Sequence, residues 1–374
     1  MRHTSRITLS GGSMDAYKPV VHGALDEAEL ARLGLRADHL IDFSSNINPF
    51  GPPESVLQAL RTLNPAPYPD RSCLHLRRHL AAIHHCQPEA VLVGNGANEL
   101  IHLVARALGE PGATALVVAP TYGEYAYASH LAGMRVIEIR STVGNGFQPD
   151  LAELLLTIER LRPRLIWLCS PNNPTGVNLS VTTITELAHT CALHQGWLIL
   201  DRAYLALGRD ETGHDPLDHN SPSRLIRIYS LTKSYAVAGL RIGYMIADPD
   251  VIAATARFQP AWSVSSAAQA AAAAMLHDTG FLATTLPALW DASSELAQNL
   301  RQIGLTVWRA HLPFMLVHCD NAALTRQQLL VRGCVVRDCT SFGLPEWVRV
   351  APRRPSENAR LLAAWRDVHA RTQV

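Results

Sequence analysis

Lysine is almost absent from this chain of 374 residues: only Lys18 and Lys233 occur among its 33 basic residues. Aromatic residues make up 6% and charged residues 17%, and the 32 acidic residues leave a net charge of only +1. No segment concentrates basic residues in the way that nucleic-acid-binding segments do. The charge pattern therefore excludes electrostatic recruitment to DNA, RNA or an anionic lipid surface.

Long apolar runs and closely spaced cysteine pairs are also missing. No stretch reaches the roughly 18 uninterrupted apolar residues that indicate a membrane-spanning helix, and the opening MRHTSRITLSGGSM lacks the apolar segment of a signal peptide. The seven cysteines include no C-x-x-C pair, and an odd number in a chain without a leader is typical of reduced thiols. We expect a cytosolic protein with no structural disulfide and no membrane contact.

Histidine is plentiful, and five potential metal ligands gather at His75, His79, His84, His85 and Cys86. His75 and His79 have the i, i+4 spacing of one helix face. The segment LHLRRHLAAIHH nevertheless lacks the carboxylate of an H-E-x-x-H helix. We predict an ordinary amphipathic helix here and no metal site.

The hydrophobic content of 48% is sufficient for a large core. Short strand-like runs alternate with helical stretches along the first two thirds of the chain. The runs lie at residues 90–93, 115–118, 135–139, 164–169, 197–200 and 225–229. This alternation predicts an α/β fold with a mostly parallel central sheet covered by helices on both faces.

The pattern changes after residue 247, where SSAAQAAAAAML begins a helical region with Ser265 or Ser266 as its N-cap. From about residue 275, helix, strand and helix patterns indicate a smaller α+β domain. We therefore divide the chain into a polar extension (1–18), an N-terminal arm with part of the small domain (19–70), a large domain (71–274) and a C-terminal small domain (275–374).

The segment VLVGNGANEL is typical of a strand that enters a glycine-rich turn and then a helix. Gly94 and Gly96 permit a tight turn, and the N–H groups of Ala97 and Asn98 would lie at the helix N-terminus, where phosphate is favoured. The run is not G-x-G-x-x-G and has no P-loop lysine. Both an anion site and a plain turn remain open on this segment alone.

Two further segments follow predicted strands. SPNNPTG, residues 170–176, places two prolines and two adjacent asparagines at a strand's carboxyl end, where open α/β sheets bind ligands. WLILDRAYLAL ends an apolar strand in Asp201 and has Tyr204 three residues later. A buried carboxylate requires a cation or hydrogen-bond donors, which a ligand, a helix N-terminus or an arginine could supply.

Lys233 lies between two hydroxyl residues in SLTKSYAVAGLRIGY, eight positions before Arg241. Taken alone, it is best interpreted as a solvated surface lysine, because most lysines are exposed.

Six motifs, in order, change that interpretation: GNGANE, PTYGEY, SPNNPTG, DRAY, SLTKSYAVAGLRIGY and WVRVAP, spread over about 250 residues. Together they resemble the fold-type I, pyridoxal-phosphate-dependent enzymes of the aminotransferase class I/II superfamily. Within it, the stretch HGALDEAELARLGLRADHLIDFSSNINPFGPP is similar to the opening of the threonine-phosphate decarboxylases, with the histidinol-phosphate aminotransferases as the next resemblance. The similarity covers residues from about 20 to 365.

The resemblance implies pyridoxal 5'-phosphate as cofactor, bound covalently by Lys233. It also implies that Asp201 holds the pyridine nitrogen protonated and that Tyr122 stacks on the ring, these two and Lys233 being the expected catalytic residues. Asn173 and Tyr204 would bind the ring hydroxyl oxygen. The phosphate ligands would be Gly96, Ala97, Asn98, Ser230, Thr232, Arg241 and, from a partner subunit in a homodimer, Tyr68.

The substrate contacts implied by the resemblance are Arg349 for the α-carboxylate, Arg337 and His22 for a phosphate, and Asn46 and Asn173 beside them. Two positions depart from the family pattern: Arg202 stands where an acidic residue is usual, and Ser170 where asparagine or threonine is common. Strand alternation should point Arg202 away from the side of Asp201.

The implied reaction is decarboxylation of L-threonine-O-3-phosphate to 1-amino-2-propanol phosphate, a precursor of the cobalamin side chain. Phosphoserine or an amino acid phosphonate as substrate, and aminotransfer from histidinol phosphate, stay open, since the reaction depends on which Cα bond is perpendicular to the cofactor ring. A regulator that carries this fold beside a DNA-binding domain is disfavoured by the short N-terminal extension and the balanced charge.

Overall fold

The computed structural model describes residues 6–9, 20, 23, 26–209, 215–218 and 221–372. Its helices are α1 (Glu27–Leu33), α2 (Glu54–Arg61), α3 (Leu74–Ile83), α4 (Gly96–Leu108), α5 (Glu124–Leu131), α6 (Leu151–Leu161), α7 (Val181–Leu193), α8 (Pro249–Ala256), α9 (Ser266–His277), α10 (Gly280–Gln302), α11 (Ala322–Leu330) and α12 (Pro355–Thr372). Short 3-10 turns include η6 (Ala238–Leu240) and η7 (Thr340–Phe342).

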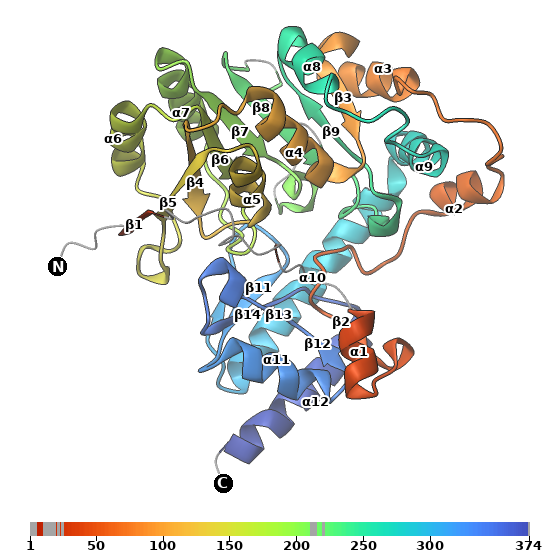
Figure 1. The fold of residues 1–374 in the computed structure, drawn as a ribbon. Coiled ribbons are helices and arrows are strands. Elements are labelled where there is room, and N and C mark those ends of the chain that lie inside the picture. Colours follow the sequence, from red (N-terminus) through yellow and green to blue (C-terminus); the bar gives the residue numbers. More distant parts are fainter. Residues whose placement is uncertain are drawn as a thin grey trace.

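An eight-stranded mixed sheet forms the larger part of the molecule, in the upper half of Figure 1. Its strands, in spatial order, are β1 (Arg6–Leu9), β5 (Arg135–Arg140), β4 (Thr114–Ala119), β6 (Leu165–Cys169), β7 (Trp197–Asp201), β8 (Leu225–Ser230), β9 (Gly243–Ile246) and β3 (Val91–Gly94). The pairs from β5 to β8 are parallel, and β1, β9 and β3 join antiparallel. The six predicted strand runs coincide with β3 to β8, and the predicted α/β fold is confirmed.

Helices cover both faces of this sheet because successive side chains of its strands point to opposite faces and nearly all are apolar. On one face, α4, α5 and α8 pack over a core that includes Ile101, Trp167 and Ile228. On the other face, α6 and α7 cover one half, with Leu154 and Leu198 in their core, while α3 and α9 cover the half near β3 and β9. Each face therefore has its own apolar core.

The helix predicted after residue 265 begins as expected. Ser265 is the N-cap of α9, and its hydroxyl accepts a hydrogen bond of 3.1 Å from the N–H of Ala268. The alanine run of this helix lies against α2 and α3. It is thus a closely packed helix, as its small side chains allow.

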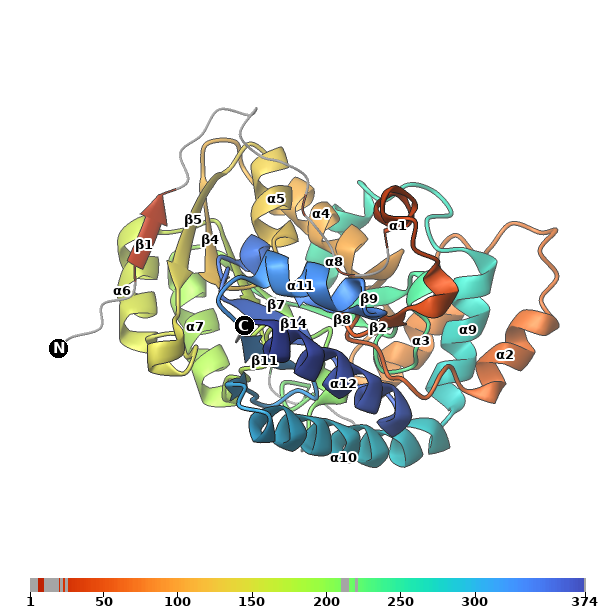
Figure 2. The ribbon, with the colours of Figure 1, turned by 90° about the horizontal axis from the view of Figure 1, so that it is seen from below.

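A second, smaller sheet lies below the first in Figure 1, beside α10, α11 and α12. It contains, in spatial order, β10 (Val307–Trp308), β11 (Met315–His318), β14 (Trp347–Val350) and β13 (Arg337–Asp338), all antiparallel. The pair β12 (Cys334–Val335) and β2 (Ile41–Asp42) brings the N-terminal arm to this unit, and α10 lies beside α12 (Figure 2). The boundaries at residues 70 and 274 stay predictions.

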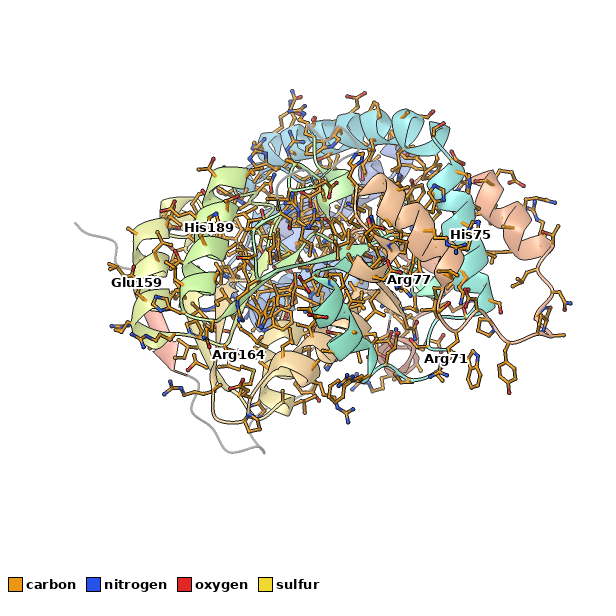
Figure 3. All side chains as sticks on the ribbon, turned by 90° about the horizontal axis from the view of Figure 1, so that it is seen from above. Arg71, His75, Arg77, Glu159, Arg164 and His189 are labelled. Carbon is orange, nitrogen blue, oxygen red and sulfur yellow. The ribbon has the colours of Figure 1, made fainter. Side chains whose placement is uncertain are left out.

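In the described part of the chain, no helix is long and apolar enough to cross a membrane, and no three histidine, cysteine or acidic side chains gather as metal ligands. The expected lack of a metal site stays a prediction. His75 lies on α3 (Figure 3), and the ring of His79 contacts His277 of α9 at 4.5 Å between centroids. All seven cysteines are free thiols.

Candidate active site

A pocket opens where the carboxyl ends of β6, β7 and β8 meet the N-terminus of α4 and the smaller sheet. Its polar and charged side chains come from segments far apart in sequence, which the fold brings to one edge of the large sheet. Among the predicted site residues, those that line it are Asn46, Ala97, Asn98, Tyr122, Asn173, Asp201, Tyr204, Ser230, Thr232, Lys233, Arg241, Arg337 and Arg349.

Lys233 lies inside this pocket, three residues after the end of β8, and not on an open surface. Its backbone carbonyl accepts a hydrogen bond of 3.0 Å from the N–H of Asn48, which anchors the segment to the N-terminal arm. Removal from water, followed by the charges of Arg241 and Arg349, lowers the pKa of the Lys233 amine to about 8. About a tenth of this amine is thus neutral and nucleophilic at pH 7, far more than for an ordinary lysine.

Asp201 ends β7 and is buried at 4% exposure, on the same face as the pocket. Oδ2 accepts a 2.7 Å hydrogen bond from the hydroxyl of Tyr125, and Oδ1 accepts one of 2.7 Å from the N–H of Ala203. Burial raises the pKa of this carboxyl, while the two donors and the charge of Lys233 oppose that rise. A carboxylate held this way is suited to bind a protonated ring nitrogen.

The N-terminus of α4 and the segment after β8 form a cradle of donors. Gly96 has a φ of 79°, and a Cβ there would lie 2.6 Å from Nη2 of Arg241, so only glycine allows the guanidinium this close. The hydroxyls of Ser230 and Thr232 are 2.7 Å apart. With the helix N-terminus of α4, these groups can hold a phosphate.

Aromatic and amide groups lie between the cradle and Asp201. The hydroxyl of Tyr122 donates to Oδ1 of Asn98 over 3.3 Å, and its ring meets that of Tyr125 edge to face. The hydroxyl of Tyr204 accepts from Nδ2 of Asn46 over 3.2 Å. A flat aromatic ligand could therefore rest against Tyr122 with Tyr204 at its edge.

Two buried arginines face the pocket from the smaller sheet. Arg337 and Arg349 are directly opposite each other on β13 and β14 and are only 6% and 5% exposed. Like charges in that arrangement repel. Burial and the charge of Arg349 lower the pKa of Arg337 to about 10. Among the described residues that line the pocket, Asp201 is the sole acid, against four cationic side chains.

Each of the two guanidinium groups is held by neighbours. Arg349 donates to the carbonyl of Ser44 over 2.6 Å and to Oδ1 of Asn173, while its Nε–H has no partner among the described residues. Arg337 donates to Oγ of Ser341 over 2.7 Å and lies 5.3 Å from the ring centre of Phe342. Fixed donors of this kind are suited to bind a ligand with two anionic groups.

Three predicted residues are not among the residues that line the pocket. Gly96 supports it from beneath Arg241, as its φ and close approach require. Tyr68 is 81% exposed and stacks on Trp262, with ring centres 4.7 Å apart. His22 lies outside the described residues, so its predicted place next to a substrate phosphate stays a prediction.

Eleven lining residues were absent from the sequence prediction, and four of them have side chains at functional positions of the pocket: Tyr125, Cys169, Ser341 and Phe342. Tyr125 lies in the first turn of α5, three residues after Tyr122, which precedes the N-cap Gly123 of that helix. Both tyrosines belong to PTYGEY, so the motif that predicted Tyr122 also contained Tyr125. Ser341 and Phe342 lie in η7, a few residues after Arg337 of β13. Nothing in the sequence CTSFG distinguishes these two residues from an ordinary turn.

Comparison with known proteins gives one consistent result. A family model described as aminotransferase class I and II matches residues 38–364. The threonine-phosphate decarboxylase of Salmonella typhimurium is 35% identical over 356 residues, which cover 93% of this chain and 96% of the relative. Histidinol-phosphate aminotransferase 2 of Ralstonia nicotianae is 31% identical over 371 residues, covering 96% of each chain.

The same likeness holds for the fold. The crystal structure of histidinol-phosphate aminotransferase from Sinorhizobium meliloti, in complex with pyridoxal-5'-phosphate, superposes with a TM-score of 0.83 at 22% identity. The match covers 97% of this chain and 99% of that chain. The two chains thus share one fold.

Proposed function

The chain belongs to the aminotransferase class I and II family, and from this premise we propose that it decarboxylates L-threonine-O-3-phosphate to 1-amino-2-propanol phosphate. The observation that carries the proposal is the pair of buried arginines, Arg337 and Arg349, which face each other across two strands beside Lys233. A substrate with a carboxylate and a phosphate would neutralise both. The most similar of the relatives named above is a threonine-phosphate decarboxylase.

The cofactor is pyridoxal 5'-phosphate, and the pocket fits it. Lys233 can bond to its aldehyde, and Asp201 can accept a hydrogen bond from its ring nitrogen. Ser230, Thr232 and Arg241 with the N-terminus of α4 can hold its phosphate. When bound, the cofactor forms a covalent bond with the substrate amine and its ring accepts the electron pair of a breaking Cα bond.

The residues of this chain would contribute binding, orientation and proton movement. Arg349 would hold the α-carboxylate through its guanidinium group, because this side chain lines the pocket. Arg337 would hold the phosphate, so that the two arginines together set the rotation about Cα. That rotation would decide which Cα bond is broken, and in a decarboxylase it would be the bond to the carboxylate, which would leave as carbon dioxide.

Lys233 would then return a proton to Cα. Its amine has a pKa of about 8, so it can carry a proton and release it near neutral pH. Asp201, kept in place by Tyr125 and Ala203, would stabilise the positive ring nitrogen throughout. The net change is loss of carbon dioxide from the substrate and gain of one proton at Cα.

Two alternatives use the same residues. Phosphoserine or an amino acid phosphonate would satisfy the same two arginines with the same reaction. Aminotransfer from histidinol phosphate is supported by the relative from Ralstonia nicotianae, at 31% identity. An aminotransferase would use Lys233 to move the Cα proton to the cofactor, and would therefore need a keto acid to regenerate it.

We further propose a cytosolic homodimer. The exposed ring of Tyr68, at 81%, would reach the cofactor phosphate of a second copy, as the family resemblance implies. This contact would make each site depend on both subunits.

Whether the reaction requires a keto acid tests the proposed decarboxylation. The cofactor-loaded protein is supplied with L-threonine-O-3-phosphate, and both the consumption of this substrate and the formation of 1-amino-2-propanol phosphate are measured with and without 2-oxoglutarate. We expect many turnovers in both cases. Turnover that stops after one equivalent without 2-oxoglutarate and resumes with it would replace this proposal with an aminotransferase. Phosphoserine and histidinol phosphate, tested in parallel, rank the substrates.

A further inference from the structure

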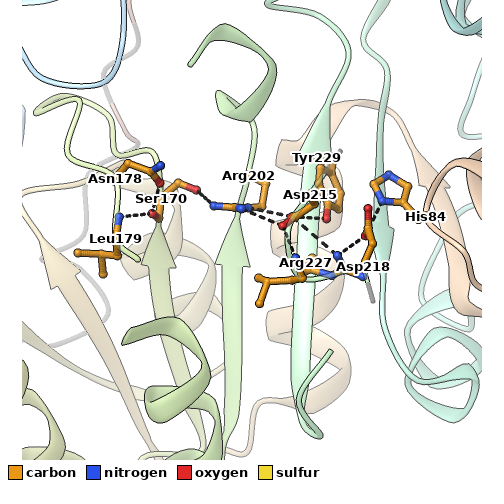
Figure 4. A network of polar contacts seen from close by, with 10 residues as sticks. His84, Ser170, Asn178, Leu179, Arg202, Asp215, Asp218, Arg227 and Tyr229 are labelled. Carbon is orange, nitrogen blue, oxygen red and sulfur yellow. Dashed lines mark hydrogen bonds and ion pairs between the residues drawn. The ribbon is translucent and has the colours of Figure 1, made fainter. Parts of the chain in front are cut away.

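A buried polar network joins the ends of several strands of the large sheet (Figure 4). The alternation of side chains along a strand places this network on the face opposite the pocket. On β7 and just after it, alternation places Asp201 on the pocket side and Arg202 on the other. On β8, Ser230 lines the pocket and Tyr229 belongs to the network. The structure thus agrees with the expectation that Arg202 points away from the side of Asp201.

Arg202 connects the ends of three strands. It is 4% exposed, and its Nε and Nη2 donate to the two oxygens of Asp215 over 3.0 and 2.9 Å. Its Nη1 donates to the carbonyl of Ser170, just after β6, over 2.8 Å. Asp215 in turn accepts a 2.7 Å hydrogen bond from the hydroxyl of Tyr229 on β8. One ion pair therefore links the ends of β6, β7 and β8.

The network continues to β9 and α3. Arg227 of β8 pairs with Asp218 over 2.6 Å, and Asp218 also contacts Nδ1 of His84 over 2.9 Å. Nε2 of His84 lies 2.9 Å from the hydroxyl of Tyr244 on β9. The side chains of Arg202, Asp215, Arg227 and Asp218 are all at most 3% exposed. Buried charges of this kind fix the geometry of the groups that pair with them.

The cofactor contacts are immediate neighbours of this network in sequence. Asp201, for the ring nitrogen, precedes Arg202, and Ser230, for the phosphate, follows Tyr229. The backbone N–H of Arg202 also donates to the carbonyl of Ile228 over 2.7 Å. A shift of Arg202 relative to Tyr229 would therefore change the distance between the two ends of the cofactor site.

We propose that Arg202 and Asp215 are positioning residues that fix the spacing between Asp201 and Ser230, and hence between the ring-nitrogen and phosphate contacts of the cofactor. The arginine that departs from the family pattern thus has a defined partner in Asp215. The proposal rests on the cofactor assigned above and not on the identity of the substrate.

The test compares cofactor binding with stability. Apoprotein is titrated with pyridoxal 5'-phosphate without substrate, by absorbance, for Arg202→Gln, Asp215→Asn and the double variant. We expect the cofactor Kd to rise about ten- to a hundredfold in all three, since displacements of about 1 Å at a site have effects of this size. The double variant leaves no unpaired buried charge, so it should regain thermal stability over the single variants without regaining affinity.

Two further variants separate positioning from stability. Leu154→Ala opens a cavity in the core under α6, so it should lower the Tm while leaving the cofactor Kd unchanged. Arg202→Lys keeps the charge but loses the two-pronged contact, and should recover part of the affinity. The pH midpoint at which the ring nitrogen of the bound cofactor loses its proton should move to lower values in Arg202→Gln, because a displaced Asp201 stabilises the protonated ring nitrogen less.

The results that would overturn the proposal are distinct. If the unaltered chain binds no pyridoxal 5'-phosphate, the proposed function fails and this proposal fails with it. If the unaltered chain binds it, and Arg202→Gln and the double variant bind it with the same Kd and pH midpoint, the network has a structural role only. Neither result depends on which substrate the enzyme uses, because cofactor binding is measured without substrate.

Discussion

The hydroxyl of Tyr125 donates a hydrogen bond of 2.7 Å to Oδ2 of Asp201 at the base of the pocket. Tyr125 is 1% exposed, so this hydrogen bond is buried. A hydrogen bond to a buried charged group contributes about 1.5–3 kcal/mol. This contact therefore helps to keep Asp201 ionised against a pKa that burial raises.

We predict that Tyr125→Phe lowers kcat roughly tenfold and raises the pH at which activity is lost on the acid side, because Asp201 becomes easier to protonate. Asp201→Asn removes the charge and should lower kcat by about 100-fold or more. The measurement is the pH profile of kcat for both variants. An unchanged acid limb in Tyr125→Phe would contradict this role of the hydrogen bond.

Lys233 should capture the cofactor in a pH-dependent way. Only the neutral amine attacks an aldehyde, and the pKa of Lys233 is lowered to about 8, so the rate of capture should fall about tenfold per pH unit below that value and level off above it. The rate is followed by absorbance after apoprotein and cofactor are mixed.

The shortage of lysine provides a clean control for that experiment, because Lys18 is the only other lysine in the chain. After borohydride reduction, peptide mapping should find the cofactor on Lys233 in both the unaltered chain and Lys18→Ala. Lys233→Ala should retain no covalent label. Label on Lys18, or capture that titrates near the pKa of an ordinary lysine, would contradict the assignment.

Substitutions of the two buried arginines should have different effects on ligand binding, because each arginine binds a different group of the substrate. Arg337→Gln should raise the KM for L-threonine-O-3-phosphate by about 10- to 100-fold, the size expected for charge-assisted hydrogen bonds, with little effect on the binding of L-threonine. Arg349→Gln should weaken both ligands. Arg309→Gln, which alters an arginine over Trp290 away from the pocket, serves as the control. Equal losses for both ligands in Arg337→Gln would contradict a phosphate contact.

Much of this arrangement was predictable from the sequence because it is encoded locally. The strands β3 to β8 follow from short apolar runs, and Lys233, Asp201 and Arg241 follow from motifs that keep a fixed order and spacing. The N-cap of α9 was predicted at one of two adjacent serines because hydroxyl side chains favour that position.

The remainder depends on contacts between distant segments, which a local pattern does not contain. Asp215 pairs with Arg202, which lies 13 positions earlier in the chain, and the sequence around Asp215 has no motif that marks a buried acid. Arg337 and Arg349 become opposite neighbours only through the register of β13 and β14. Ser341 and Phe342 acquire a role only because η7 places them next to Arg337.

Tyr68 should act in a second subunit. Its ring is 81% exposed and stacks on Trp262, outside the pocket of its own chain. Tyr68→Ala and Lys233→Ala should each have low activity alone, and mixed dimers of the two should regain activity, because one site then has an intact lysine and an intact tyrosine from the partner. No recovery in mixed dimers, verified by subunit exchange, would place Tyr68 within its own site or outside any site.

The fate of the substrate carboxylate tests the central claim most directly. Cofactor-loaded protein in excess is mixed once with L-threonine-O-3-phosphate that carries an isotopic label in its carboxyl group, with no keto acid present, and labelled carbon dioxide is counted. The account predicts one equivalent of carbon dioxide per substrate and a cofactor that ends bonded to Lys233, as it began. A cofactor converted to pyridoxamine phosphate, with the label retained in a keto acid, would contradict it.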